Sequence, residues 1–191
     1  MAKLRAVVVG IPGVGKTTIV EKMRVRMKET KLVTFGTVMF EEAVNLKWAK
    51  DRDKLRTLPV EKQRRLQTLA ATKIVKMKDN AVLVDTHLFI RTNEGYWPGL
   101  PFEVVKALKP THLVLVEASP KEIAARRAAD KTRSRDSLTE EGLSAELALG
   151  RSFLAVSSTL TGAPMIIVAN HEGKSDEAAA EVTSMLVSAA R

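Results

Sequence analysis

The stretch Gly10-Ile11-Pro12-Gly13-Val14-Gly15-Lys16-Thr17 matches the pattern G-x-x-x-x-G-K-[ST] in full. An apolar run, Leu4–Val9, precedes it and a helical pattern follows it, which is the order that a strand–loop–helix phosphate cradle requires. The three glycines let the backbone turn so that successive N–H groups point inward, and the following helix presents its positive N-terminus to the same anion. The sequence therefore predicts that residues 10–17 bind the phosphates of a nucleotide.

Two side chains of this loop have predicted roles: Lys16 bridges the β- and γ-phosphates, and the Thr17 hydroxyl ligates a shared Mg²⁺. The residues expected to contact ATP are Gly10, Ile11, Pro12, Gly13, Val14, Gly15, Lys16, Thr17 and Thr18. The apolar run 82–84 ends in Asp85, the form of a strand whose terminal carboxylate holds magnesium or its water shell. The plainer alternatives are a glycine-rich turn with a solvated lysine, and an aspartate that only caps a turn.

Outward from the loop, short apolar runs alternate with longer helical patterns, which is typical of a parallel sheet wound with helices. Continuous apolar runs are expected of strands that are covered on both faces. They predict five strands, at Leu4–Val9, Lys31–Phe35, Ala81–Val84, His112–Val116 and Met165–Val168. We therefore expect an α/β fold of the P-loop NTPase kind: a five-stranded parallel sheet, helices on both faces and a short lid.

Helix signals lie between these runs. Helical spacing of apolar residues predicts a core-facing helix within Pro59–Lys78. Ser119, Pro120 and Glu122 supply an N-cap, a proline at the first helical position and a capping-box glutamate. Two further helix N-caps are expected at Thr139 and Ser175. Two candidate binding loops are expected at Ile90–Pro101 and Thr132–Ser137.

Composition limits the class of protein. With 191 residues, 45% of them hydrophobic, the chain is expected to form a single domain over 1–191. There is no cysteine, no apolar run long enough to cross a bilayer and no visible secretory signal, so we expect a cytoplasmic protein without a membrane anchor. A net charge of +9 attracts anions, but one Tyr, two Trp and five Phe give little support for a base-stacking surface, which disfavours nucleic-acid binding.

Arginines fall in the segments expected at the carboxyl edge of the sheet, where ligands bind. They are Arg52, Arg56, Arg91, Arg126, Arg127, Arg133 and Arg135. Guanidinium groups bind phosphate oxygens in a fixed geometry, and a phosphate acceptor needs no general base because it is already largely ionised. This arginine-rich pattern favours a nucleoside monophosphate as acceptor. A single arginine such as Arg126, four residues before Asp130, is better explained as surface decoration.

With these motifs together, the sequence resembles the archaeal adenylate kinases over nearly the whole chain. The resemblance is carried by residues 10–17, 35–40, 51–56, 84–87, 90–92, 95–101 and 132–136. It implies the reaction ATP plus AMP to two ADP with Mg²⁺, a five-stranded core and a homotrimer. It also implies an acceptor-binding insert at about 36–78 and a short lid at about 127–138.

The resemblance also assigns residues. Lys16, Arg127, Arg133 and Arg135 are similar to the catalytic lysine and lid arginines, and Thr17 and Asp85 to the metal-binding pair. AMP is expected to contact Gly36, Thr37, Arg52, Arg56, His87 and Arg91. Asn170–Gly173 is expected to lie against the adenine of ATP. Since few residues separate Arg127 from Thr139, no large lid fits, and we expect the arginine loop to order only with both nucleotides bound.

Two alternatives stay open. The first is a P-loop kinase whose acceptor is CMP, UMP or a small hydroxylated metabolite, with Asp53 or Asp136 as its general base. The second is a nucleotide-gated ATPase or binding module that acts on RNA, for which the charge of +9 would matter directly. Gly36, Thr37 and Arg91 have no evident role in such a module.

Overall fold

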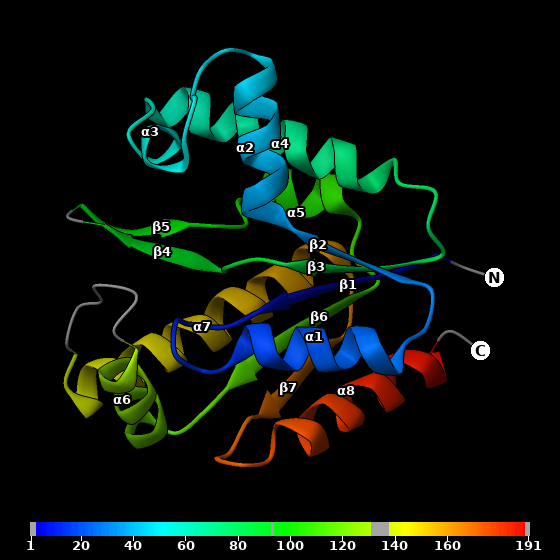
Figure 1. Cartoon of the computed structure of the whole chain (residues 1–191), viewed down its shortest axis with the longest axis vertical. Coiled ribbons are helices and arrows are strands. Elements are labelled where there is room, and N and C mark those ends of the chain that lie inside the picture. The colour runs from blue at the N-terminus through cyan, green and yellow to red at the C-terminus, as the bar shows by residue number, and fades with distance from the viewer. Residues whose placement is uncertain (1–2, 93, 131–137, 190–191) are drawn as a thin grey trace.

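The computed structural model describes residues 3–92, 94–130 and 138–189, and its centre is a five-stranded parallel sheet (Figure 1). The strand order is β2-β3-β1-β6-β7. The bounds are β1 Leu4–Val9, β2 Thr30–Thr34, β3 Ala81–Asp85, β6 His112–Glu117 and β7 Met165–Ala169. Each predicted strand is confirmed to within one residue at either end. The second strand stops at Thr34 because Phe35 already begins a helix.

Burial separates the middle of this sheet from its edges. Every residue of β1 and β6 is buried, which agrees with their continuous Val- and Leu-rich runs. At the edge, the side chains of Met165 and Ile167 in β7 are 49% and 45% exposed. Only one residue of β2, Val33, is buried. The prediction that all five strands are covered on both faces is therefore wrong for β2 and β7, the two edge strands, each with a neighbour on one side only.

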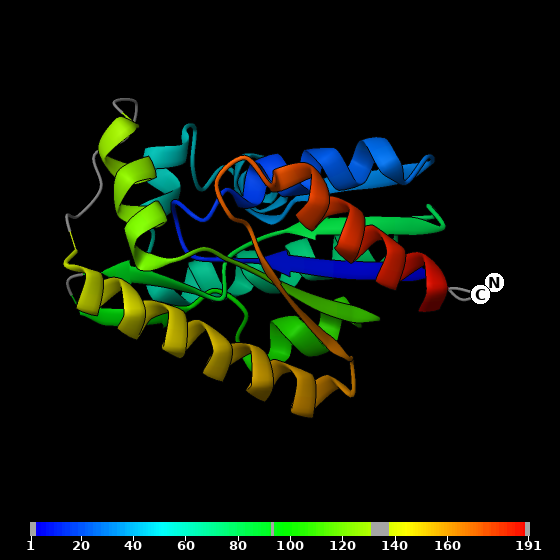
Figure 2. The ribbon, with the colours of Figure 1, turned by 90° about the horizontal axis from the view of Figure 1, so that it is seen from below.

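The helices are α1 Lys16–Arg26, α2 Phe35–Asn45, α3 Arg52–Arg56, α4 Val60–Val75, α5 Phe102–Leu108, α6 Pro120–Ala129, α7 Glu140–Thr161 and α8 Ser175–Ala189. Figure 2 shows α1 and α8 side by side over one face of the sheet, with α5 and α7 over the other. The sheet is thus the middle layer of three, as the alternation of strands and helices predicts.

The predicted helix signals are largely confirmed. The Ser119 hydroxyl and the Glu122 carboxylate form the expected capping box at the start of α6, and the Thr139 hydroxyl accepts from the backbone N–H of Gly142 at the start of α7. Helix α4 lies within the predicted span 59–78. Ser175 is the first residue of α8 and not the residue before it.

The predicted loop Ile90–Pro101 contains an antiparallel hairpin, β4 Phe89–Thr92 and β5 Gly95–Pro98. Its ladder places Arg91 opposite Tyr96. The strands are only four residues each, and their Gly and Pro residues are signals for a loop, so the sequence alone did not predict them. The hairpin projects from the same end of the sheet as α6 (Figure 1).

Helices α2, α3 and α4 form an insert at one side of the sheet (Figure 1). The insert has a small hydrophobic cluster of its own, made of Ala43, Ala49 and Leu66, distinct from the main core. Met39 packs against both clusters. The insert is therefore packed partly by itself and partly against the sheet. Within the part of the chain that the structure describes, no helix combines the length and apolar character needed to cross a membrane.

Candidate active site

The phosphate loop lies at the point where the order of the sheet reverses. Because β1 pairs with β3 on one side and β6 on the other, the loop after β1 opens into the crevice where ligands of such sheets bind. Gly13 and Gly15 have φ values of +95° and +85°, a conformation that favours glycine. The predicted strand–loop–helix context of residues 10–17 is therefore confirmed.

Lys16 and Asp85 are in contact at the base of this loop. The pairing of Val8 with Asp85 places the end of β3 next to the end of β1. The Lys16 ammonium, on a side chain that is 9% exposed, donates to the Asp85 carboxylate. Thr17 follows in the first turn of α1. Lys16, predicted to bind ATP, and Asp85, predicted to bind the metal, thus lie in direct contact.

The donor set at this point suits magnesium. No group of three or more His, Cys, Asp or Glu side chains that would hold a metal occurs among the described residues. The oxygen donors beside the phosphate loop are the Asp85 carboxylate, which pairs here with Lys16, and the hydroxyl of Thr17 in the first turn of α1. Mg²⁺ prefers hard oxygen ligands and usually keeps several waters and phosphate oxygens, so one or two protein ligands are enough. The residues present fit this ion.

Two neighbouring arginines of α6 hold the phosphate loop by its carbonyl oxygens. Arg127 Nε donates to the carbonyl of Pro12 at 2.9 Å, and Arg126 Nη1 donates to that of Val14 at 3.2 Å. Successive residues of a helix point about 100° apart, so α6 holds the loop in two directions. The interpretation of Arg126 as surface decoration is wrong, because its guanidinium reaches across to the loop.

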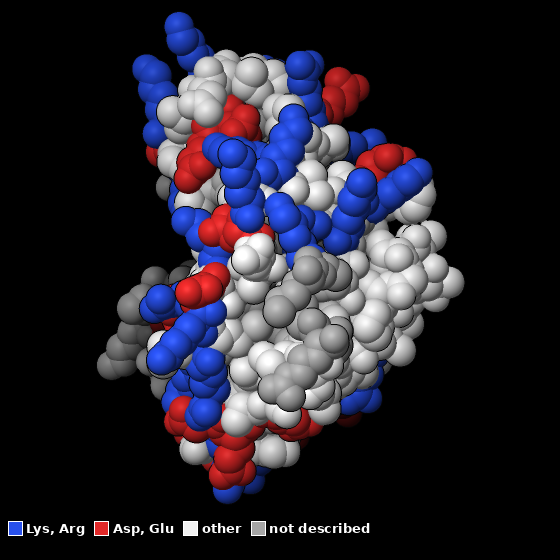
Figure 3. Space-filling view, turned by 90° about the vertical axis from the view of Figure 1, so that its right-hand side faces the viewer, with Lys and Arg blue, Asp and Glu red and all other residues white. Residues whose placement is uncertain are grey.

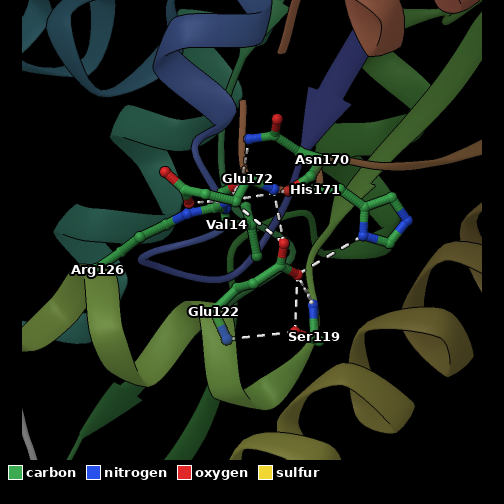
Figure 4. A network of polar contacts seen from close by, with 7 residues as sticks. All are labelled: Val14, Ser119, Glu122, Arg126, Asn170, His171 and Glu172. Carbon is green, nitrogen blue, oxygen red and sulfur yellow. Dashed lines mark hydrogen bonds and ion pairs between the residues drawn. The ribbon is translucent and has the colours of Figure 1, made fainter. Parts of the chain in front are cut away.

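A polar network joins α6 to the segment after β7 (Figure 4). Glu122 accepts hydrogen bonds from the Ser119 hydroxyl at 2.7 Å, the Ser119 N–H at 2.9 Å and the Glu172 N–H at 2.7 Å. These bonds, with the Ser119 hydroxyl the largest cause, lower the pKa of Glu122 to about 2. Arg126 Nη2 donates to the backbone carbonyl of Asn170 at 2.9 Å. The network fixes the start of the predicted adenine-side segment.

Asn170 also touches the phosphate loop directly. Its side chain is buried, and Nδ2 donates to the Val14 carbonyl at 2.7 Å. A Cβ on Gly15 would lie 2.3 Å from that Nδ2 atom, so only glycine leaves room for the amide. The phosphate loop, α6 and the residues after β7 are therefore packed together on the side of the site predicted to bind ATP.

A cleft of about 890 Å³ opens between the phosphate loop, the insert and the hairpin. Its lining includes Pro12, His87, Arg91, Trp97, Arg127 and Glu146. Three predicted site residues from separate segments, His87, Arg91 and Arg127, are thus brought to one cleft. A volume of this size is within the usual range of small-molecule sites.

Comparison with known proteins gives consistent matches over nearly all of this chain. A family model described as an AAA domain matches residues 9–144. An adenylate kinase of Pyrococcus horikoshii is 44% identical over 183 residues, which cover 94% of this chain and 93% of that protein. The adenylate kinases of Methanocaldococcus jannaschii and Thermoplasma acidophilum are 43% and 39% identical, over 94% and 96% of this chain and 96% and 98% of their own. The chain belongs to the adenylate kinase family.

Solved structures support the fold of this family member. A shikimate kinase from Acinetobacter baumannii, solved with shikimate, superposes with a TM-score of 0.64 at 14% identity, over 97% of this chain and 94% of that one. A shikimate kinase from Bacteroides thetaiotaomicron gives 0.61 at 11% identity, over 96% and 98%. The adenylate kinase family member thus shares its fold with kinases of very different sequence.

The other predicted acceptor residues of this adenylate kinase family member lie on the insert. Arg52 Nη2 donates to the Thr37 hydroxyl at 2.8 Å, so two of them are already in contact. A Cβ on Gly36 would meet nothing within 4 Å. Gly36, Thr37 and Arg52 are not among the residues that line the cleft, and Arg56 ends α3. Arg133 and Arg135 lie outside the described residues.

Sequence reasoning did not assign Tyr96 or the buried Glu146 to the site. It predicted Glu122 only as a capping residue, and it expected Asn170 against the adenine and not against the phosphate loop. Two of these four residues had a signal. Asn170 is the first polar residue after an apolar strand, at the edge where ligands bind. Glu146 lies in the buried stripe of α7 with Leu143 and Leu154, where a charge is unusual.

Proposed function

We propose that this chain is an adenylate kinase that transfers the γ-phosphoryl group of Mg·ATP reversibly to AMP, giving two ADP. The observation that carries the proposal is the juxtaposition of the Lys16 loop with a cleft lined by His87, Arg91 and Arg127. It occurs in a chain that is 44% identical to an adenylate kinase over nearly its full length.

The donor half supplies binding and charge. The inward N–H groups of residues 10–17 and the Lys16 ammonium hold the β- and γ-phosphates. On ATP binding, the phosphates replace Asp85 as the hydrogen-bond partner of the Lys16 ammonium. Thr17 and Asp85 would hold Mg²⁺, which would supply positive charge beside these phosphates. Since Arg126 and Arg127 fix the Val14 and Pro12 carbonyls, the loop is preorganised, and little reorganisation is left for the reaction itself.

The acceptor half orients the second phosphate. Arg91 on β4 faces the cleft and holds the AMP phosphate together with Arg52 and Arg56. His87 lies beside the acceptor, and Gly36 and Thr37 receive the adenine and ribose. Arg127, with Arg133 and Arg135 of the lid, stabilises charge on the transferring group and closes the site against water. An ionised AMP oxygen attacks without a general base.

The proposal extends to the assembly, which we propose is a homotrimer in the cytoplasm. Exposed apolar side chains gather on the edge strand β7 and on the helices beside it, α7 and α8. They are Val156, Leu160, Met165, Ile167, Met185 and Val187. An exposed strand edge can pair with another chain, and exposed apolar side chains gathered in one region mark interaction sites. This edge supports contact between subunits, while the cytoplasmic location rests on the sequence features alone.

The test is a coupled assay of ADP formation from Mg·ATP with AMP, CMP, UMP or GMP, on the wild type and on Arg133→Ala. We expect turnover specific to AMP and a fall of about 100-fold or more in the variant, equivalent to ~2.7 kcal/mol of transition-state stabilisation. Arg64→Ala, an exposed arginine of α4, is the matched control and should leave the rate unchanged.

Other outcomes separate the alternatives. Turnover with another monophosphate or a small metabolite would keep the fold and change the substrate. Phosphate release stimulated by RNA, with no turnover on any nucleotide acceptor, would support an RNA-associated ATPase instead.

A further inference from the structure

Glu146 is a buried carboxylate that the proposed reaction does not use. Among the described residues of α7, those that are buried are Leu143, Glu146, Gly150, Leu154 and Ser157, and Glu146 alone of these carries a charge. The residue is 5% exposed. A buried charge is costly to a fold unless it is paired and hydrogen-bonded, so its partners indicate its role.

Its two carboxylate oxygens contact two different parts of the molecule. Oε2 lies 3.4 Å from Arg127 Nη2, which belongs to α6. Oε1 accepts a hydrogen bond of 3.3 Å from the Tyr96 hydroxyl, which belongs to the hairpin strand β5. One carboxylate from α7 therefore joins α6 to the hairpin.

The Arg127 contact leads to the donor side. Arg127 Nε donates to the Pro12 carbonyl of the phosphate loop at 2.9 Å, and the Arg127 side chain is 11% exposed. A Cβ on Gly13 would lie 3.1 Å from Arg127 Cγ, so the guanidinium stem is packed directly on the loop. A shift of Arg127 is therefore transmitted to Pro12 and Gly13.

The Tyr96 contact leads to the acceptor side. Tyr96 pairs with Arg91 across the hairpin, and its ring packs edge-on against Phe89, with centroids 5.1 Å apart and planes at 81°. Phe89 in turn packs against Phe153 of α7, with centroids 5.7 Å apart. Tyr96 therefore belongs to an aromatic cluster on the hairpin, and the residue paired with it across the ladder, Arg91, is our proposed ligand of the AMP phosphate.

Direct binding of a nucleotide by Glu146 does not fit its surroundings. It lines the cleft that receives the two nucleotides, and both of these are anions. A carboxylate would repel their phosphates at short range. Glu146 must therefore act on nucleotide binding through its two partners, the Arg127 guanidinium and the Tyr96 hydroxyl.

We propose that Glu146 is a positioning residue that couples the two nucleotide sites, through Arg127 to the phosphate loop and through Tyr96 to the hairpin. This inference rests on the proposed function, which assigns ATP and AMP to the two sides. Binding of AMP fixes Arg91 and with it the hairpin; Tyr96 then fixes the carboxylate, and the carboxylate fixes Arg127 over the loop. By linkage, ATP tightens AMP binding by the same factor as AMP tightens ATP binding.

The test is calorimetric titration of AMP into the protein with and without Mg²⁺ and the β,γ-imido analogue of ATP. The ratio of the two dissociation constants is the coupling factor. We expect a factor of about five or more in the wild type, the lower end of typical couplings, and less than about twofold in Glu146→Gln and in Tyr96→Phe. Combining the two substitutions should reduce the coupling no further than either does alone.

Glu141→Gln is the matched control, because it removes the same charge from an exposed position of the same helix. It should keep the wild-type coupling factor. Tyr96→Phe removes one hydroxyl from a side chain that is 41% exposed, so it answers the question even if Glu146→Gln does not fold.

Several results overturn the inference. One is a coupling factor near one in the wild type. Another is an unchanged factor in the variants, with both dissociation constants raised together, which is the result of a purely structural role. If the wild type binds no AMP at all, the proposed function fails as well, whereas AMP binding with equal coupling in all variants removes this inference alone.

Discussion

At the scale of single residues, Gly99 has the strictest steric requirement on the acceptor side. A Cβ at this position would lie 2.2 Å from the carbonyl oxygen of His87 and 3.0 Å from its carbonyl carbon. Both atoms are backbone, so no side chain can turn away to make room. The glycine lets the chain leave the hairpin directly against His87, two residues after the end of β3, and the Gly99 N–H donates to the Leu88 carbonyl at 2.8 Å.

Gly99→Ala should therefore displace His87 and the hairpin. We expect the KM for AMP to rise by about tenfold or more, equivalent to ~1.4 kcal/mol, while the affinity for the ATP analogue stays unchanged. Steady-state kinetics and calorimetry measure the two quantities. Gly142→Ala is the control, because its nearest neighbours are side-chain atoms at 3.5 Å or more. An unchanged KM for AMP in Gly99→Ala would contradict the steric argument.

Glu122 gives a prediction about pH. Its pKa is lowered from 4.5 to about 2 in the folded protein, first by the Ser119 hydroxyl and then by the Ser119 N–H. A lowered folded pKa contributes stability above the unfolded pKa, and this contribution is lost as pH falls from 4.5 towards 2. Glu122→Gln should thus be less stable than the wild type at pH 6, with a difference that shrinks over this window.

Urea denaturation of both proteins at a series of pH values measures that difference. Glu177→Gln, on the exposed surface of α8, controls for the loss of one carboxylate. A stability difference that is constant from pH 6 to below pH 3 would show that Glu122 does not act through its charge.

At the scale of elements, β1 anchors two helices as well as the phosphate loop. The Arg5 side chain, 6% exposed, donates through Nη1 to the carbonyls of Leu108 and Lys109 at 2.9 and 3.1 Å and through Nη2 to that of Val75 at 3.4 Å. These carbonyls lie at the C-terminal ends of α5 and α4, where helix carbonyls lack partners. One arginine therefore caps both helices from the sheet.

Arg5→Met should leave these carbonyls unpaired while keeping most of the buried volume. We expect a loss of about 2–3 kcal/mol in the free energy of unfolding, measured by urea denaturation, with the KM values for both nucleotides unchanged. Arg24→Met, in an exposed pair with Glu21, should cost less than about 1 kcal/mol. Equal losses in the two variants would show that Arg5 is not a cap.

The same scale shows how much of the structure follows from sequence. Runs such as Leu4–Val9 and His112–Val116 predict central strands, because only strands covered on both faces need continuous apolar residues. The hairpin at Phe89–Pro98 was not predicted, because its two strands are held by hydrogen bonds to each other and by the packing of Phe89 on Phe153 of α7. Local sequence carries neither signal.

In the site too, local features were predictable from the sequence and long-range contacts were not. The phosphate loop was predictable because its chemistry is local, with glycines and Lys16 close in sequence. Arg126 was misjudged because an i,i+4 partner explained it locally, whereas its contact with Val14 spans 112 residues. Glu146 stands out in an apolar stripe, but its contacts with Arg127 and Tyr96 exist only in the folded chain.

At the scale of the whole molecule, the basic side chains are distributed unevenly over the surface. Figure 3 shows Lys and Arg side chains gathered over the upper part of one face, where Figure 1 places the insert. With a net charge of +9, the protein attracts anionic nucleotides over distances up to about a Debye length, ~8 Å at physiological salt. That face carries the two termini and is turned away from the hairpin and α6 (Figure 1), so its charge adds to the long-range attraction of anions and not to the lining of the cleft.

The proposed trimer makes a prediction at this scale. Ile167→Lys places a charge on the exposed edge strand, and we expect it to dissociate the assembly, because a buried unpaired ammonium is costly. Sedimentation equilibrium measures the mass of the assembly. Val25→Lys, at a residue that is 69% exposed on α1, should leave the mass unchanged. Wild-type protein that sediments as a monomer would refute the assembly itself.

The separate cluster of Ala43, Ala49 and Leu66 in the insert also matters for evolution and design. Because these three side chains pack mainly among themselves, mutations confined to this cluster are felt little by the main core beneath the phosphate loop. The ATP-binding site can thus stay unchanged while evolution or design alters the insert and with it the phosphate acceptor. A library within residues 36–78 that keeps the main-core residues Val38, Ala70, Ala71 and Ile74 is the natural starting point for redirecting this scaffold to a new phosphate acceptor.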